Sequence, residues 1–402
     1  MSKLSKELTR LLTLLLEQNG SDLHLKSGAA PKMRINGVIN SLSRDIIAPQ
    51  AIAEIAQEIM TPEEWARFER DQEIDFMFQA PRLGRFRVNV YRQMMGLAIA
   101  MRHIQGDIPS IDELNLPQVL YTLISRPRGL ILITGATGSG KSTTLAAMVE
   151  TLNRTAQLNI ITIEDPIEFA FKEKKCSIQQ REVGRDTPSW GEALRRIMRQ
   201  DPDVIVLGEI RDAETMLTGL TAANTGHLVL ATMHTMDTTQ TVNRVLSFAP
   251  AELQTETRYV LSSTLVAVIS LRLLSRLDKA GRVPAVEVMV ATETIRKLIL
   301  DPAMTLNIRN AVADGFGQYG MQTFDQALMQ LYKEGVISLS EALKNATSPT
   351  DFKIKARGID GQTSGYGWGE SATSAAPPGP VKNRDQVHGG ASYKPGADDH
   401  DD

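Results

Sequence analysis

The sequence predicts an α/β protein that folds as a small N-terminal α+β domain followed by a larger domain built on a mainly parallel sheet. The first observation is length, because 402 residues exceed the usual size of one domain. The second is that short β-like segments alternate with amphipathic helices before residue 107. The third is that nearly continuous Val/Ile/Leu runs follow Arg128, and such runs are typical of parallel strands with helices on both faces.

The composition is that of a soluble globular protein, with 42% apolar and 23% charged residues. A net charge of -3 removes the basic excess typical of nucleic-acid-binding proteins, so no nucleic acid partner is expected. The single cysteine, Cys176, excludes an internal disulfide and a multi-cysteine zinc module, and it favours a reducing, cytoplasmic compartment. No apolar run reaches the roughly 18 residues of a membrane span, so any membrane role is expected to be peripheral.

The N-terminal domain is predicted to span residues 1–107. Leucines at helical spacing predict a first helix over residues 4–18, which Asn19-Gly20 ends. Two further helices are predicted at 49–60 and 62–70, the second with Thr61 as its N-cap. Strands are predicted at residues 22–26, 32–39, 74–79, 85–91 and 97–104.

The rest of the chain is predicted to form a linker, a second domain and a tail. Prolines indicate a linker over residues 108–127 with one short helix at 117–125. The second domain covers residues 128–357, with strands at 130–134, 159–163, 203–207 and 227–232 and helices at 143–152, 292–300, 322–334 and 338–345. Residues 358–402 are rich in Gly, Ser, Pro and Asp, which predicts a disordered tail, with a docking tail anchored by Tyr366 and Trp368 as the alternative.

A phosphate-binding loop is predicted where the first strand of the second domain meets its first helix. Gly135-Ala-Thr-Gly-Ser-Gly-Lys-Ser142 matches G-x-x-x-x-G-K-[ST] at every fixed position, which disfavours a plain glycine-rich turn. Glycines let backbone N–H groups approach phosphate oxygens, and the helix N-terminus adds positive charge. We expect Lys141 to reach the β- and γ-phosphates of ATP and Ser142 to ligate Mg²⁺. The nucleotide-binding candidates are Gly135, Ala136, Thr137, Gly138, Ser139, Gly140, Lys141, Ser142 and Thr143.

Acidic residues follow two of the predicted strands. Glu209 closely follows the strand at 203–207, where it is expected to orient the water that attacks the γ-phosphate. A surface ion pair with Arg211 is the alternative for Glu209. Glu164 and Glu168 follow the strand at 159–163 and are expected to shape the Mg²⁺ and water environment, with Glu168 as a second acid at the metal. Loop solvation is the alternative for both.

Two histidines flank the strand at 227–232. His227 opens this strand and His234 follows its end. Histidines at strand ends are usually structural, and the spacing leaves both a structural role and a place at the phosphate site open. Two histidines without nearby cysteines are a weak signal for zinc.

Further motifs together identify a family. They are Gly20-Ser-Asp-Leu-His-Leu, Gly84-Arg-Phe-Arg-Val-Asn, Ile161-Thr-Ile-Glu-Asp-Pro-Ile-Glu-Phe, Gln180-Arg-Glu-Val, Asp203 to Asp212, Thr225-Gly-His to His234, and Gly320-Met-Gln-Thr-Phe-Asp. With the P-loop, they make residues 3–355 resemble the type IV pilus retraction ATPases, the PilT/PilU family of the secretion ATPase superfamily. Thr294-Ile-Arg-Lys-Leu-Ile is similar to the family's retraction signature with two substitutions, which leaves a PilT-type and a PilU-type assignment open.

The resemblance implies a PAS-like N-terminal domain, a RecA-like P-loop ATPase domain and a homohexamer. It also implies that N-terminal arginines approach the nucleotide, at positions matching Arg87 and Arg102, and that His234 belongs to the family's histidine box as a catalytic candidate. The spacing of Arg85 and Arg87 itself predicts that they share one strand face, because side chains two residues apart point the same way. A solvated edge strand is the alternative for these arginines.

The function that the resemblance implies is a cytoplasmic motor, dependent on ATP and Mg²⁺, that drives pilus retraction and twitching motility from the inner face of the inner membrane. The implied partners are an inner-membrane platform protein and related pilus ATPases. A PilU-like accessory ATPase and a type II secretion or DNA-transfer ATPase are the alternatives. The short N-terminal region and the lack of a four-cysteine module favour retraction over assembly.

Overall fold

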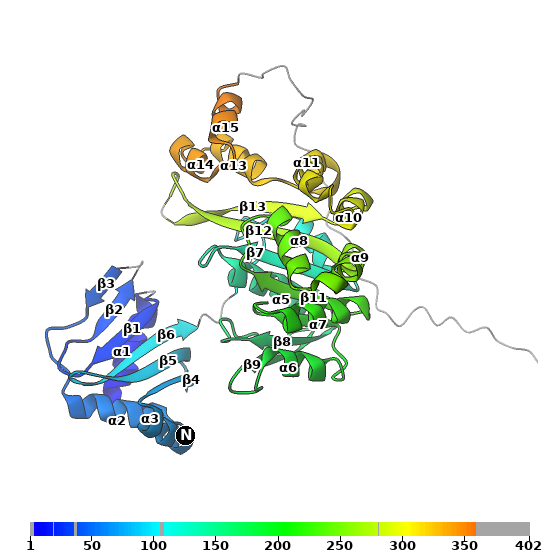
Figure 1. Cartoon of the computed structure of the whole chain (residues 1–402). Helices are drawn as coiled ribbons and strands as arrows, with labels where there is room; N and C mark the ends of the chain where they lie inside the picture. Colours follow the sequence, from blue (N-terminus) through cyan, green and yellow to red (C-terminus); the bar gives the residue numbers. More distant parts are fainter. Residues whose placement is uncertain (1–3, 19, 36–37, 105–107, 280, 359–402) are drawn as a thin grey trace, which may run out of the picture. The chain divides into compact units, whose positions relative to one another are not determined.

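The computed structural model describes residues 4–18, 20–35, 38–104, 108–279 and 281–358 (Figure 1). The chain divides into two compact units. Unit 1 comprises Met1–Ile108 with the short segment Glu168–Phe171, and unit 2 comprises Pro109–Ile167 with Lys172–Asp402. The segment predicted as a linker is grouped with unit 2 from Pro109 onward and contains helix α4. The tail predicted to be disordered lies outside the described residues from position 359.

Unit 1 is built on a six-stranded antiparallel sheet in the order β3-β2-β1-β6-β5-β4. The strands are β1 (Asp22–Lys26), β2 (Lys32–Ile35), β3 (Val38–Ser41), β4 (Glu73–Ala80), β5 (Gly84–Gln93) and β6 (Gly96–Ile104), and the helices are α1 (Lys6–Glu17), α2 (Pro49–Ile59) and α3 (Pro62–Asp71). The strand predicted at 32–39 is therefore two strands. Thr61 caps α3 as predicted, in a capping box with Glu64.

One face of the unit 1 sheet packs on helices and the opposite face carries charge. In β5 the buried side chains Phe86, Val88 and Val90 alternate with the exposed side chains of Arg85 and Arg87. The buried set joins leucines of α1 and isoleucines of α2 in one hydrophobic core. Alternation of this kind is expected of an antiparallel sheet covered on a single face.

Unit 2 is built on a seven-stranded sheet in the order β13-β12-β7-β11-β10-β8-β9. All neighbouring pairs from β12 to β9 are parallel, and only β13 runs antiparallel, as the sheet's edge strand. The strands are β7 (Gly129–Gly135), β8 (Asn159–Glu164), β9 (Ser177–Glu182), β10 (Val204–Leu207), β11 (Leu228–Met233), β12 (Leu265–Ser275) and β13 (Arg282–Val290). This α/β architecture confirms the predicted mainly parallel sheet, although β9, β12 and β13 were not predicted individually.

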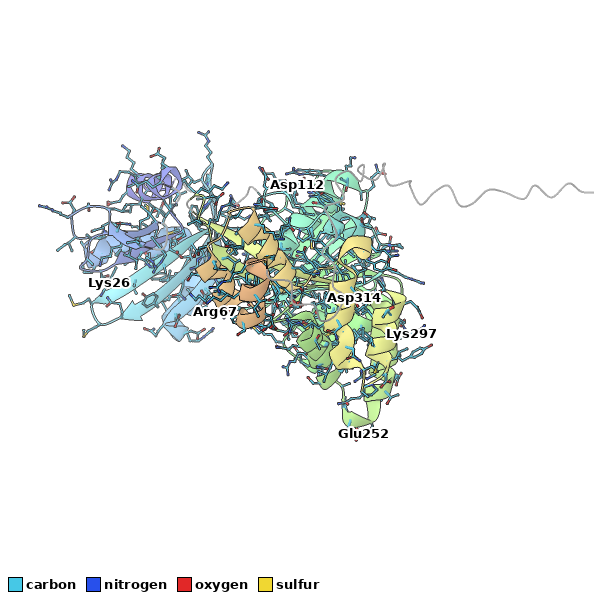
Figure 2. The ribbon with its side chains drawn as sticks, turned by 90° about the horizontal axis from the view of Figure 1, so that it is seen from above. Lys26, Arg67, Asp112, Glu252, Lys297 and Asp314 are labelled. Carbon is cyan, nitrogen blue, oxygen red and sulfur yellow. The ribbon has the colours of Figure 1, made fainter. Side chains whose placement is uncertain are left out.

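Helices cover the sheet of unit 2. They are α4 (Val119–Ile124), α5 (Lys141–Thr155), α6 (Trp190–Ile197), α7 (Ala213–Asn224), α8 (Thr238–Ser247), α9 (Gln254–Thr264), α10 (Glu293–Leu300), α11 (Ile308–Asp314), α12 (Phe316–Tyr319), α13 (Phe324–Lys333), α14 (Leu339–Asn345) and α15 (Pro349–Ala356), with 3₁₀ turns at Ala251–Leu253 and Thr305–Asn307. In α10, Ile295 and Ile299 are buried while Lys297 lies at the surface (Figure 2). Helices α13 to α15 pack against the β12–β13 hairpin around a smaller core of their own (Figure 1).

Candidate active site

The predicted phosphate loop connects β7 to α5 in a conformation that depends on glycine. Gly135, Gly138 and Gly140 have φ values of 143°, 77° and 98°, a region that side chains disfavour. A Cβ added to Gly135 would lie 2.5 Å from Ser139 Oγ and 2.6 Å from the carbonyl oxygen of Leu271. The turn at Gly135 therefore excludes a larger residue for steric as well as conformational reasons.

The loop combines exposed backbone with one buried lysine. Ala136, Thr137 and Gly138 are exposed, whereas Lys141 is only 8% exposed. Its ammonium group donates hydrogen bonds of 3.0 Å to the carbonyl oxygens of Gly135 and Ala136, so the side chain lies across the loop.

The first turn of α5 completes the loop. Ser142 and Thr143 follow Lys141 there and are half-buried, at the positive end of the helix dipole. Ser139 Oγ is buried and has no hydrogen-bond partner within the described residues. This arrangement of backbone, ammonium and hydroxyl groups is suited to polyphosphate binding.

Glu209 lies at the carboxyl edge of the same sheet. The chain after β10 is held between the two neighbouring strands. The N–H of Gly208 donates a hydrogen bond of 2.8 Å to the carbonyl oxygen of Ile163 in β8, and the N–H of Ile210 donates one of 2.9 Å to that of Thr232 in β11. Glu209 Oε2 accepts a 2.8 Å hydrogen bond from Arg211, and Oε1 lies 2.9 Å from His234 Nε2. The ion pair with Arg211 is thus present, together with a histidine contact.

The electrostatics of Glu209 connect it to the phosphate loop. Burial by itself raises the pKa of this carboxyl, but the hydrogen bond from Arg211 and the charges of His234, Arg211 and Lys141 outweigh burial and hold the pKa below its usual value. Glu209 is therefore ionised at neutral pH, and Lys141 is near enough to contribute to that state. An ionised acid beside the phosphate loop can orient a water molecule toward a bound phosphate.

The two histidines lie at opposite ends of β11. His234 follows the carboxyl end and contacts Glu209, whereas His227 precedes the strand. His227 Nδ1 lies 2.9 Å from the carbonyl oxygen of Ala222, a local contact at the end of α7. The structure thus separates two residues that spacing alone left equivalent, because the carboxyl ends of parallel strands share one edge of the sheet.

The other predicted acids have hydrogen-bond partners or exposure of their own, although Glu164 follows Ile163, whose carbonyl accepts the N–H of Gly208. Glu164 Oε1 accepts hydrogen bonds from Thr162 Oγ1 at 2.6 Å and Gln180 Nε2 at 3.0 Å, at the end of β8. Strand β8 is the third neighbour of β7, which corresponds to roughly 14 Å between strands. Glu168 is exposed and belongs to the segment grouped with unit 1. The catalytic and metal-binding roles of Glu164 and Glu168 stay predictions.

The two predicted arginines face each other across strands of unit 1. Arg87 in β5 and Arg102 in β6 are register partners on the charged face. Arg102 Nε donates a 2.8 Å hydrogen bond to the buried Asp22, whereas Arg87 is exposed and has no hydrogen bond or ion pair within the described part of unit 1. Burial tends to raise the pKa of Asp22, but hydrogen bonds from Ser21 and Arg102 and the charge of Arg102 lower it overall.

Arg211 was expected only as a possible ion-pair partner of Glu209. Its guanidinium group lies between two acids, because it also lies 3.8 Å from Asp165 Oδ2. Its position two residues after Glu209 was the available signal. Within the described residues, no group of three or more His, Cys, Asp and Glu side chains could hold a metal ion.

Comparison with known proteins places this geometry in context. The family model described as type II/IV secretion system protein matches residues 1–357. A relative from Pseudomonas aeruginosa, the type IV pilus retraction ATPase PilT, is 42% identical over 346 residues, which cover 86% of this chain and 100% of the relative. The type IV pilus ATPase PilU of the same organism is 38% identical over 352 residues, which cover 87% of this chain and 91% of the relative.

The fold is also similar to that of a solved motor. The crystal structure of the pilus retraction motor PilT with bound ADP has a TM-score of 0.78 and 40% sequence identity, and the match covers 87% of this chain and 99% of that one. The similarity therefore extends over both units and over the phosphate loop. No helix in the described part of the chain has the length and apolar character needed to cross a bilayer.

Proposed function

This chain belongs to the type II/IV secretion system protein family, and on that basis we propose that it is an ATP-hydrolysing motor for type IV pilus retraction. The observation that supports this most directly is a complete phosphate loop on the same sheet edge as Glu209, whose carboxylate contacts Arg211 and His234. Similarity to a retraction ATPase over nearly the whole chain favours pilus retraction over pilus assembly.

In this proposal the residues of unit 2 divide the work of hydrolysis. Lys141 and the loop N–H groups from Gly135 to Thr143 hold the phosphates, and Glu209 orients the attacking water with His234 as its neighbour. Because its pKa is lowered, Glu209 is a weak base, and it acts chiefly through orientation and charge. Phosphoryl transfer requires little more, since its transition state is loose and charge stabilisation dominates catalysis.

Mg²⁺ and the predicted arginines complete the proposed site. Ser142, at the start of α5, offers a hydroxyl beside Lys141 and fits the usual magnesium ligand of a phosphate loop. Bound Mg²⁺ would neutralise charge on the β- and γ-phosphates. Arg87 and Arg102 are proposed to stabilise the γ-phosphate as nucleotide-driven closure brings unit 1 toward it, and Glu164 and Glu168 to support the metal and water environment.

The proposed assembly is a cytoplasmic homohexamer that acts at the inner face of the inner membrane. Its proposed partners are an inner-membrane platform protein and related pilus ATPases. The support is similarity to pilus ATPases along the chain, together with the exposed arginine face of unit 1, which offers a charged surface to another copy. Measurement of the particle mass in solution with and without ATP tests the proposed hexamer. Co-purification with the platform protein tests the proposed membrane partner.

A PilU-like accessory ATPase is the second candidate function. The observation that favours it is 38% identity to PilU over 87% of this chain, close to the value for PilT. Deletion of the gene for this chain distinguishes a principal retraction motor from an accessory ATPase. Surplus surface pili and lost retraction are expected of a principal motor, whereas an accessory protein leaves retraction largely intact. A strain left without pili would contradict both and favour assembly.

The decisive experiment on the purified protein is Glu209→Gln. Removal of the negative charge should lower kcat by about 10²- to 10³-fold while the Kd for ATP changes little, because the amide cannot replace the carboxylate at the water. Phosphate release and calorimetric ATP binding are the two measurements.

Glu214→Gln is the matched control for that experiment. Glu214 also pairs with an arginine, Arg195, but it lies on the exposed surface of α7. Normal turnover by the Glu209 variant, or equal losses in both variants, would remove Glu209 from the mechanism and the proposed motor with it.

A further inference from the structure

A buried carboxylate in unit 2 joins the starts of two helices. Glu287, in the edge strand β13, is only 5% exposed. Its Oε1 accepts a 2.8 Å hydrogen bond from the N–H of Thr238, the first residue of α8, and its Oε2 lies 3.4 Å from the N–H donor of Phe324, the first residue of α13. Both helix N-termini present positive ends to it, which offsets part of the cost of burying the charge.

The same carboxylate anchors the segment that carries His234. This segment runs from the end of β11 to the start of α8 and has a contact at each end, His234 with Glu209 and Thr238 with Glu287. Between them, Asp237 caps α8 through the N–H of Gln240 at 2.8 Å, and the hydroxyls of Thr235 and Thr241 lie 2.6 Å apart. These bonds leave the segment little internal freedom, so the position of His234 depends on where α8 begins.

Glu287 also belongs to a polar row that reaches the phosphate loop. Its register partner in β12 is Ser270, and the Ser270 hydroxyl lies 2.7 Å from that of Thr134 in β7. Thr134 immediately precedes Gly135, and it is register partner to Met233, which precedes His234. The row is buried in a sheet whose neighbouring positions are apolar, so its polar members are unusual for their surroundings.

We propose that Glu287 is a positioning residue for hydrolysis, which holds the start of α8 so that His234 meets Glu209. This inference rests on the proposed function, in which Glu209 orients the attacking water. Glu287 contacts neither Glu209 nor the phosphate loop directly, so its effect passes through the His234–Thr238 segment. Its second bond, to α13, ties the same segment to the C-terminal helices.

Two variants perturb the Glu287–Thr238 contact from opposite sides. Glu287→Gln keeps the shape and one acceptor oxygen, but its amide nitrogen is a donor, so the side chain can no longer accept from both N–H groups. Thr238→Pro deletes the backbone donor at the first helical position, where proline is tolerated, and the extended Asp237 (φ -155°, ψ 172°) suits the residue before proline. Each should lower kcat by between about tenfold and about a hundredfold while the Kd for ATP stays within about twofold.

The matched control is Glu341→Gln. All variants are assayed at pH 8, because burial raises the pKa of Glu287 and a higher pH increases its ionised fraction. Glu341 also accepts a backbone N–H, that of Ser275 at the end of β12, and within the described residues it makes no hydrogen bond to α8. Its kcat should be that of the unaltered protein. Equal losses of kcat and ATP affinity in the Glu287 variant, in parallel with a lower melting temperature, would make Glu287 purely structural and overturn the proposal.

A double variant tests the route through His234. In a His234→Ala background, Glu287→Gln should cause no further loss of kcat, since the contact that it positions is already gone. A further loss of full size would overturn the proposal while Glu209 kept its role. Normal turnover by Glu209→Gln would instead overturn the proposed function. The two failures are therefore distinguishable.

Discussion

The sheets of the two units place their charged residues differently. The antiparallel sheet of unit 1 has helices on one face only, so Arg87 and Arg102 stand in mid-strand on the opposite face. The mainly parallel sheet of unit 2 is covered by helices, and every residue of β7 is buried. Its candidate site residues Lys141, Glu209 and His234 therefore follow the carboxyl ends of strands.

The two arrangements suit different contributions to one reaction. The strand-end site of unit 2 is preorganised, because Arg211 and His234 both hold the Glu209 carboxylate. Within unit 1, Arg87 has an exposed guanidinium group with no partner among the described residues, so it is available for the phosphate contact proposed above. Three further predictions test this division.

The largest expected effect concerns the arginine face of unit 1. Arg87→Ala should lower kcat for ATP hydrolysis by about a thousandfold, which is the size of effect known for arginines that neutralise transition-state charge. Arg85→Ala is the matched control, because Arg85 lies two residues away on the same face and donates to Gln79. Steady-state phosphate release measures both. Equal activities of the two variants would confine the reaction to unit 2.

The next effect concerns the strand-end site. Lys141→Ala should weaken ATP binding by at least about thirtyfold, or about 2 kcal/mol, because it removes a largely buried ammonium group from the phosphates. Titration calorimetry checks the value. Lys297→Ala, on the surface of α10 (Figure 2), should leave the affinity unchanged. Undiminished binding by the Lys141 variant would mean that the loop backbone alone holds the nucleotide.

The smallest expected effect concerns Arg102, which, unlike Arg87, is expected to contribute to the free energy of unfolding. Arg102→Ala should lower the free energy of unfolding by about 1 kcal/mol or less at pH 7, because its partner Asp22 is buried but the arginine itself is largely exposed. The pKa of Asp22 is lowered in the folded state, so this contribution is present above the ordinary aspartate pKa of about 4 and disappears as pH falls through the folded pKa.

Urea unfolding at several pH values measures that difference. Arg85 has no carboxylate partner within the described ranges of the chain and donates to Gln79 instead, so Arg85→Ala should show no such acid-dependent loss of stability relative to the unaltered protein. If the Arg102 difference persisted unchanged to pH 2, the ion pair with Asp22 would not be its cause.

Much of the fold was predictable from patterns within short segments. The strand at 130–134, the glycine-rich loop and the following helix appear in the structure as β7, the loop and α5, because buried strands and P-loops have strong local signals. The hairpin of β12 and β13 was missed. Its apolar runs do not distinguish a strand from a buried helix, and only pairing with β7 decides between them.

Residue type and close spacing were enough to predict the phosphate loop, the apolar strands and the acid that follows β10. Tertiary structure alone decided that His234 and not His227 meets Glu209, and that Glu287 reaches the start of α8 from a strand 49 residues further along the chain. The physical reason is that contacts across a sheet are set by strand order and register, which no local pattern specifies.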